Sequence, residues 1–350
     1  MRAPVLIIGQ GLAGTALGLE LEAARIPFEI VEAPDVTAAS RVAAGLVNPV
    51  TGQRFVKTWR VDELLPVARA AYARWEKRFG LRLWRDVEVE RRFADATERE
   101  RATRKFAAGE LAPFAKRLSE HALELEGAAW VDLPALLDAA AAHWRCAGVW
   151  RAATVQANEF EFSAAVRSPG DAIVRWRGAA FRAVICCVGY GALVREWFAG
   201  LPFALVKGQI LSLRADGLKP ERLVHRGKWL LTDHLERARV GATFERDLAD
   251  CTCTAEARAE LLAAARELAG GRANFEVLGQ AAGVRLALLD KLPLAGWHPR
   301  RPGLGCLGAL GSKGTLWAPW LAQAWAAELA GQNALSRDVS ATRFMTSATH

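Results

Sequence analysis

Three glycines follow a short apolar run at the start of the chain, and few folds accommodate this pattern. Residues 5–8 read Val-Leu-Ile-Ile, which is typical of a buried parallel strand. Over residues 12–25 the apolar side chains recur at helical spacing. Gly9, Gly11 and Gly14 therefore stand at a strand-to-helix turn, in the pattern G-x-G-x-x-G. Because these glycines break the apolar run, we do not expect a secretion signal.

Each of these glycines has its own purpose in a dinucleotide-binding turn. The first permits the tight turn, the second lets a pyrophosphate approach the backbone, and the third lets the helix pack closely on the strand. Residues 27–31 predict a second strand that ends at Glu32, whose carboxylate can accept hydrogen bonds from a ribose. This order of elements predicts a dinucleotide site, with nicotinamide and flavin cofactors both open. The alternative is a glycine-rich turn that binds nothing.

The composition predicts a protein without a membrane span or a structural metal. At 350 residues, 52% of them hydrophobic, the chain is long enough for two domains with buried cores. The most apolar segment, residues 314–331, contains a proline, a glutamine and a glutamate and is shorter than a bilayer requires. The six cysteines include no C-x-x-C pair, so we expect reduced thiols, no metal and a cytoplasmic location.

The charged residues are mixed rather than segregated by sign. The net charge of +8 arises from 46 basic and 38 acidic residues. In the densest stretch, residues 91–117, both signs alternate along a helical period, which is typical of a solvated helix face with weak ion pairs. A nucleic-acid surface would concentrate one sign, so we do not favour a nucleic-acid partner. The oligomeric state stays open.

Helices and strands alternate along most of the chain. The spacing predicts helices over residues 62–79 and 133–146 and a strand over residues 81–93, with helical sequence from there to about Leu125. Residues 203–283 change to alternating strands with one helix, which is typical of an antiparallel sheet. The sequence therefore predicts a doubly wound nucleotide domain built from separate segments, and a second domain for the substrate.

Six blocks of sequence resemble the flavin-dependent amine oxidases, the group that includes D-amino acid oxidase, glycine oxidase and monomeric sarcosine oxidase. The blocks are GQGLAG with Glu32, AAGL at residues 43–46, VDLPALL, VICCVGYGA, GVRLALLDKLPLAGWHP and GALGSKGTLWAP. The fifth block keeps the spacing of G-x-R to D-x-x-P-x-x-G-x-x-P that is found in these oxidases. The chain is thus similar to FAD-dependent oxidoreductases of the D-amino acid oxidase superfamily.

This resemblance implies a fold and a division into domains. The fold is an α/β architecture in which a Rossmann-like FAD-binding domain, discontinuous in the chain, joins an α+β substrate domain with a mixed or antiparallel sheet. The FAD-binding domain would comprise residues 1–80, 128–203 and 283–350. The substrate domain would comprise residues 81–127 and 204–282.

The resemblance also implies which residues hold FAD, without a covalent bond. The N-terminal turn and its acid would hold the ADP half, and the flavin ring would pass against a loop of small residues. The C-terminal glycine turn would face the flavin's pyrimidine end, where backbone donors stabilise the negative charge of the reduced form. The implied cofactor residues are Gly9, Gly11, Leu12, Ala13, Gly14, Glu32, Ala43, Ala44, Gly45, Leu46, Val155, Gly189, Gly311, Ser312, Lys313 and Gly314.

Three further residues are candidates for the substrate half of the site. Arg285 occupies the position that grips the substrate carboxylate in D-amino acid oxidase and glycine oxidase, and its planar guanidinium can bind both oxygens. The alternative for this arginine is an ion pair with Asp290. Trp229 stands where these oxidases carry a tyrosine, and it can wall an apolar pocket. Asn48 directly follows the small-residue loop and could belong to a substrate-specific wall.

Together with the resemblance, these residues predict a flavoenzyme that oxidises a carbon–nitrogen bond of a small amine or amino acid. Hydride would pass from the carbon next to nitrogen to the flavin N5, the imine would hydrolyse, and oxygen or another acceptor would reoxidise the flavin. Two other activities remain open: oxidation of a tRNA wobble-uridine side chain and dehydrogenation of a hydroxy acid.

Overall fold

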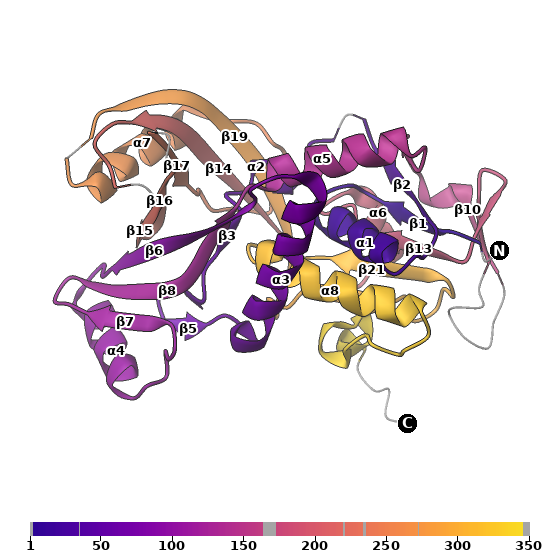
Figure 1. Cartoon of the computed structure of the whole chain (residues 1–350), viewed down its shortest axis with the longest axis horizontal. Coiled ribbons are helices and arrows are strands. Elements are labelled where there is room, and N and C mark those ends of the chain that lie inside the picture. Colours follow the sequence, from indigo (N-terminus) through magenta and orange to yellow (C-terminus); the bar gives the residue numbers. More distant parts are fainter. Residues whose placement is uncertain are drawn as a thin grey trace.

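Two large β-sheets organise the protein (Figure 1). The structure is a computed structural model that describes residues 3–34, 36–163, 173–219, 221–233, 236–271 and 273–345. The smaller sheet lies in the right half of Figure 1, and the larger sheet lies in the left half. A parallel nucleotide-type sheet beside a largely antiparallel one confirms the expected fold class. The residue boundaries of the two domains stay a prediction.

Among the described residues, six strands form the smaller sheet, in the order β20-β21-β13-β1-β2-β9. All neighbours are parallel except β20, which runs antiparallel to β21. Val5 and Ile7 join the core on the side of α1 and α8, whereas Leu6 and Ile8 join the core on the side of α6. Because both faces are buried, the central strands β1 and β13 are continuously apolar. The strands are β1 (Val5–Ile8), β2 (Phe28–Glu32), β9 (Trp150–Ala152), β13 (Ala183–Cys186), β20 (Leu294–Trp297) and β21 (Leu304–Gly308).

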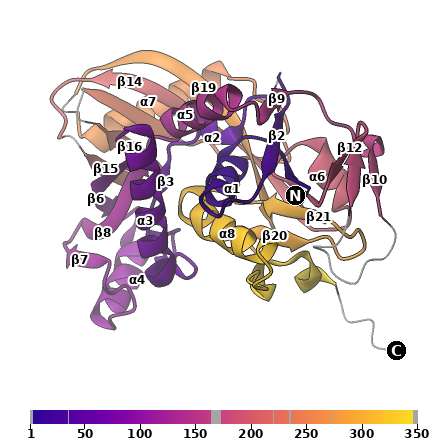
Figure 2. The same cartoon turned by 45° about the vertical axis from the view of Figure 1, so that its right-hand side comes forward.

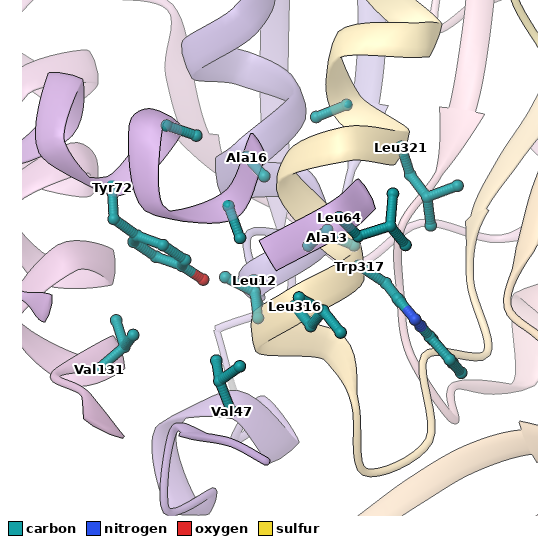
Figure 3. Packing of buried hydrophobic residues seen from close by; sticks show 14 of the residues in the cluster. Leu12, Ala13, Ala16, Val47, Leu64, Tyr72, Val131, Leu316, Trp317 and Leu321 are labelled. Carbon is teal, nitrogen blue, oxygen red and sulfur yellow. The ribbon is translucent and has the colours of Figure 1, made fainter. Parts of the chain in front are cut away.

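Three helices share one core on the side of the smaller sheet to which Val5 and Ile7 point (Figure 3). They are α1 (Leu12–Ala23), α3 (Val61–Phe79) and α8 (Gly314–Leu329). Nearly every residue of α1 is buried, so this helix is apolar on all sides. The buried Tyr72 hydroxyl of α3 donates to the backbone carbonyl of Thr315, with 3.1 Å between the oxygens. This bond ties α3 to the first turn of α8.

In the described part of the chain, ten strands form the larger sheet, with the path β18-β14-β17-β16-β15-β6-β8-β3. β19 pairs with β14, and β7 pairs with β8. The long antiparallel pair of β14 and β19 places Gly208 opposite Gly283. Helix α7 (Ala255–Ala269) covers one face of this sheet through Leu261 and Ala265. The strands are β3 (Leu46–Val47), β6 (Trp84–Arg92), β7 (Ala115–Leu118), β8 (Ala122–Val131), β14 (Phe203–Ala215), β15 (Arg222–Arg226), β16 (Lys228–Thr232), β17 (Arg237–Gly241), β18 (Glu245–Arg246) and β19 (Phe275–Leu288).

The remaining elements flank the two sheets. A three-stranded sheet of β10, β11 and β12 lies next to α6 at the edge of the molecule (Figure 2). No helix in the described ranges is long and apolar enough to cross a membrane. These elements are α2 (Ala39–Val42), α4 (Ala96–Ala107), α5 (Leu133–Cys146), α6 (Ala192–Trp197), β4 (Val50–Thr51), β5 (Val56–Lys57), β10 (Phe160–Phe162), β11 (Val174–Trp176) and β12 (Ala179–Phe181).

The expectation of helix as far as Leu125 is wrong. Helix α4 ends at Ala107, and the chain then forms β7 and β8. Gly109 adopts a φ of +69° and Pro113 follows, so the helix cannot continue through this segment. From residue 122 onward the sequence alternates, and Leu123 and Leu125 are buried on the same side of β8. The alternating charges of residues 91–117 fit a helical period, so they gave no sign that strands follow.

Candidate cofactor and substrate site

A cavity of about 460 Å³ lies between the two sheets. One wall consists of segments that follow the smaller sheet's parallel strands at their carboxyl ends, where doubly wound folds bind their ligands. The other wall comes from β14, β16 and β19. The predicted residues that line the cavity are Gly9, Gly11, Leu12, Ala13, Glu32, Ala43, Ala44, Gly45, Leu46, Val155, Gly189, Trp229, Arg285, Gly311, Ser312 and Gly314. The predicted residues outside the lining are Gly14, Asn48 and Lys313.

The first glycine turn has no room for side chains. Gly9 adopts a φ of +100°, and a Cβ there would lie 2.7 Å from the carbonyl oxygen of Cys187. Gly11 is the N-cap of α1 and borders the cavity, so a ligand can approach the helix N-terminus closely. Gly14 faces the turn rather than the cavity, because a Cβ there would lie 1.9 Å from the carbonyl oxygen of Gly9. The third glycine thus permits the close packing of α1 on β1.

Glu32 lies at the end of β2, beside this turn. Its carboxylate accepts a hydrogen bond from the backbone N–H of Gln10. Burial raises the pKa of Glu32, while the bond from Gln10 and the charge of Arg41 act in the opposite direction. The buried Gln10 side chain donates to the carbonyl oxygen of Leu137 at 2.9 Å, which holds the turn against α5. Gln10 is one of the unspecified positions of G-x-G-x-x-G, so the pattern does not predict this contact with α5.

Replacement of Glu32 by glutamine should have opposite effects on stability and on cofactor binding. A carboxyl group whose pKa is higher in the folded state stabilises the fold when protonated, and this contribution is lost as the pH rises through the raised pKa. The cofactor-free Glu32→Gln variant should therefore unfold at a higher temperature than the wild type at pH 8. The difference should vanish below the ordinary glutamate value of 4.5.

FAD binding should weaken about tenfold in the same variant, because a neutral amide is a weaker acceptor for ribose hydroxyls than a carboxylate. Thermal unfolding across pH and FAD titration measure the two effects. Glu29→Gln, on the same strand but outside the cavity lining, is the control. Equal cofactor affinities for Glu32→Gln and the wild type would contradict the role of this carboxylate.

Ser40 is a site residue that the sequence analysis missed. It belongs to α2, lines the cavity, and accepts a hydrogen bond from the backbone N–H of Leu12, with 3.1 Å between the atoms. Its hydroxyl therefore occupies the N-terminus of α1, where the helix leaves backbone donors free. A serine in a stretch of small residues carries no pattern of its own, so only the folded chain identifies it.

The small-residue loop after α2 forms one wall of the cavity. Ala43, Ala44 and Gly45 lie side by side along it. Gly45 adopts a φ of +71°, and a Cβ there would lie 2.0 Å from the carbonyl oxygen of Val131. The backbone N–H of Val131 donates to the carbonyl oxygen of Gly45 at 3.0 Å. The end of the loop is thus held directly on β8.

The C-terminal glycine turn presents a second helix N-terminus to the cavity. Gly311 and Gly314 line it, and the side chain of Lys313, the N-cap residue of α8, forms no capping hydrogen bond. The N–H of Gly311 donates to the carbonyl oxygen of Leu286, which joins this turn to β19. Lys313 points elsewhere: its ammonium lies 5.4 Å from the centre of the Trp317 ring, and burial lowers its pKa. The backbone of this turn, rather than the lysine charge, faces the cavity.

Arg285 brings a charged group into the substrate half of the cavity. Its Nη2 donates to the carbonyl oxygen of Thr243 at 3.3 Å, and burial lowers its pKa. The alternative pairing with Asp290 is wrong, because Asp290 accepts from Nε of Arg343 at 2.8 Å. Among the described residues no carboxylate forms an ion pair with Arg285. A partly buried guanidinium without a counter-ion is suited to bind an anionic ligand.

Glycine at position 208 makes room for this arginine. A Cβ on Gly208 would lie 2.0 Å from Nη2 of Arg285 and 3.1 Å from the carbonyl oxygen of Thr243. The guanidinium therefore crosses β14 directly over Gly208, which also lines the cavity. The ring of Phe244, which is 62% exposed, lies 5.9 Å from the guanidinium carbon. Phe244 thus stands between Arg285 and solvent.

Trp229 and Asn48 have different surroundings. Trp229 lies over Gly241, where a Cβ would come within 2.6 Å of the indole, and it lines the cavity together with Ile210. The side-chain oxygen of Asn48 instead accepts from the backbone N–H of Val50 at 3.2 Å. Asn48 therefore stabilises the turn between β3 and β4, a common role of asparagine, and it does not reach the cavity.

The fold and this site define a class of protein. A parallel sheet with glycine turns and helix N-termini at its carboxyl edge holds a dinucleotide, and the second sheet closes the cavity over it. This is the architecture of a dinucleotide-dependent oxidoreductase. The family model described as FAD dependent oxidoreductase matches residues 4–329, and the chain belongs to this family. The glycine turn fits FAD, because Gly11 lines the cavity at the N-terminus of α1 and leaves the backbone there open to a pyrophosphate.

Solved structures share the fold over nearly their whole length. Glycine oxidase from Geobacillus kaustophilus superposes with a TM-score of 0.74 at 22% identity, over 96% of this chain and 99% of its own. Iminodiacetate oxidase from Chelativorans sp. BNC1 superposes with a TM-score of 0.74 at 22% identity, over 96% of this chain and 98% of its own. L-proline dehydrogenase from P. horikoshii superposes with a TM-score of 0.71 at 15% identity, over 98% of each chain. At these identities the likeness concerns the fold.

Proposed function

We propose that this oxidoreductase oxidises a carbon–nitrogen bond of a small amine or amino acid that carries a carboxylate. The observation that carries the proposal is the partly buried Arg285 guanidinium, which lines the cavity and has a backbone carbonyl as its hydrogen-bond partner. The substrate carboxylate would supply the missing negative charge. The named activities of the similar glycine oxidase and iminodiacetate oxidase structures support the same class of substrate.

The walls of the substrate half orient the substrate and exclude water. Ile210, Trp229, Val284 and Leu286 line this part of the cavity, and none of their side chains accepts or releases a proton near neutral pH. The substrate amine would therefore enter already neutral, with its carboxylate held by Arg285. FAD, when bound, would supply the redox chemistry as the hydride acceptor. The apolar walls favour a small, uncharged substituent on that carbon.

The test is to mix the FAD-loaded protein, without oxygen, with single compounds and to follow the flavin absorbance. The panel contains glycine, sarcosine, proline and D-amino acids, each beside the matching amine that lacks the carboxylate. We expect one or more of the amino acids to bleach the flavin, and their decarboxylated partners to react far more slowly. Hydroxy acids form a second panel, and bleaching by these alone would contradict the proposal, as would a flavin that no compound of either panel reduces.

A further inference from the structure

Arg239 reaches from the larger sheet to the backbone of the cavity wall. It lies on β17, between Ser212 of β14 and Leu231 of β16. Its Nη2 donates to the carbonyl oxygen of Val42 at 3.0 Å and to that of Ala43 at 3.3 Å. These are the last residue of α2 and the first residue of the small-residue loop. A single guanidinium thus holds the point at which the chain enters the wall.

Ala43, Ala44 and Gly45 of the small-residue loop have no polar side chains with which to form hydrogen bonds. Its far end is fixed by the pairing of Gly45 with Val131, where the N–H of Val131 donates at 3.0 Å. Its near end follows a helix of four residues, which is too short to be stable on its own. Arg239 satisfies two carbonyls at this end, which the helix leaves without partners. Both ends of the loop are therefore anchored on the larger sheet.

Arg239 forms no ion pair within the described ranges that would compete with its hydrogen bonds to the loop backbone. Burial lowers its pKa, and the charge of Asp132 acts in the opposite direction. Asp132 itself accepts from the N–H of Ala135 as the N-cap of α5. Within the described ranges, no carboxylate lies at ion-pair distance from Arg239. Its donors are therefore directed to backbone carbonyls rather than to an acid, and they form charge-assisted hydrogen bonds in a partly buried setting.

We propose that Arg239 is a positioning residue for the cofactor. By holding the carbonyls of Val42 and Ala43, it sets the position of the wall against which FAD packs, and it couples that wall to β17. The proposal rests on the FAD site and not on the identity of the substrate. Without Arg239, the loop would have to be ordered by the cofactor itself, so part of the binding free energy would be consumed in ordering it.

The experiment compares three variants in the apoprotein. Arg239→Met removes the donors at similar length, Arg239→Lys keeps the charge on a shorter side chain without the planar guanidinium, and Arg237→Met is the control. Arg237 lies on the same strand and is exposed. FAD affinity is measured by titration of flavin fluorescence, the flavin environment by its absorbance bands, and the fold by thermal unfolding.

We expect Arg239→Met to bind FAD about tenfold more weakly, with shifted absorbance bands, and Arg239→Lys to lie between it and the wild type. Arg237→Met should behave as the wild type. If Arg239→Met does not fold, Arg239→Lys still tests the proposal through its weaker FAD binding. Wild-type affinity and absorbance in the Arg239 variants, with lower thermal stability alone, would overturn the proposal. A wild-type chain that takes up no FAD would overturn the cofactor site as well.

Discussion

Replacement of Arg285 by methionine is expected to raise the KM for a carboxylate-bearing substrate by roughly a hundredfold to a thousandfold. The guanidinium is partly buried, lines the cavity and forms no ion pair with the described carboxylates, so its charge is available to the substrate. The value of kcat should change less, because a substrate that does bind still meets the same apolar walls. Steady-state kinetics, or flavin reduction measured without oxygen, separates the two constants.

Protein stability provides the control for this prediction. Removing Arg285 leaves no buried acid without a partner, so the free energy of unfolding should not fall in Arg285→Met. Arg343→Met should leave the KM unchanged and lower the free energy of unfolding by less than about 1 kcal/mol, because it removes the partner of the exposed Asp290 at 2.8 Å while leaving the cavity intact. An unchanged KM in Arg285→Met would contradict the carboxylate site. Equal losses of stability and affinity in that variant would make Arg285 a structural residue.

Gly14→Ala is expected to abolish FAD binding and to lower the free energy of unfolding by on the order of 3 kcal/mol. The added Cβ would lie 1.9 Å from the carbonyl oxygen of Gly9 and 3.3 Å from a methyl group of Ile7. The first of these atoms is backbone, so α1 must move away from β1. That movement displaces the helix N-terminus and the glycine turn together. FAD uptake and urea unfolding measure the two consequences.

Gly279→Ala is the matched control. Gly279 lies on β19, opposite Ser212, and none of the described atoms would come within 4 Å of its added Cβ. The same substitution there should alter the free energy of unfolding by less than about 1 kcal/mol and should leave FAD binding unchanged. Normal FAD uptake by Gly14→Ala would contradict the close packing of helix and strand at the first turn.

Arg285, which lines the cavity, and Arg239, which holds the backbone of its wall, show why single residues are hard to assign from a sequence. Arg285 stands out because its spacing to a proline- and glycine-rich block matches a known family, whereas Arg239 stands in an ordinary alternating strand. The hydrogen bond from Arg239 to Val42 joins residues 197 positions apart. Ser40 is similar, since its contact with Leu12 crosses 28 positions. Nothing in the local sequence of either residue marks these partners.

The sequence alone determined the features that depend on neighbouring residues. The turn at Gly9, Gly11 and Gly14 followed from glycine spacing, and helix α5 from its apolar period between Leu133 and Cys146, because local sterics and burial decide both. The family blocks added the placement of Arg285.

Only the tertiary structure decided what depends on distant segments. It showed that residues 115–118 and 122–131 form strands, and that Asp290 pairs with Arg343 rather than with Arg285. Each of these outcomes depends on which partner another part of the chain brings within hydrogen-bond distance. Local propensity cannot specify such a partner, because the contact exists only once both sheets have formed around the cavity.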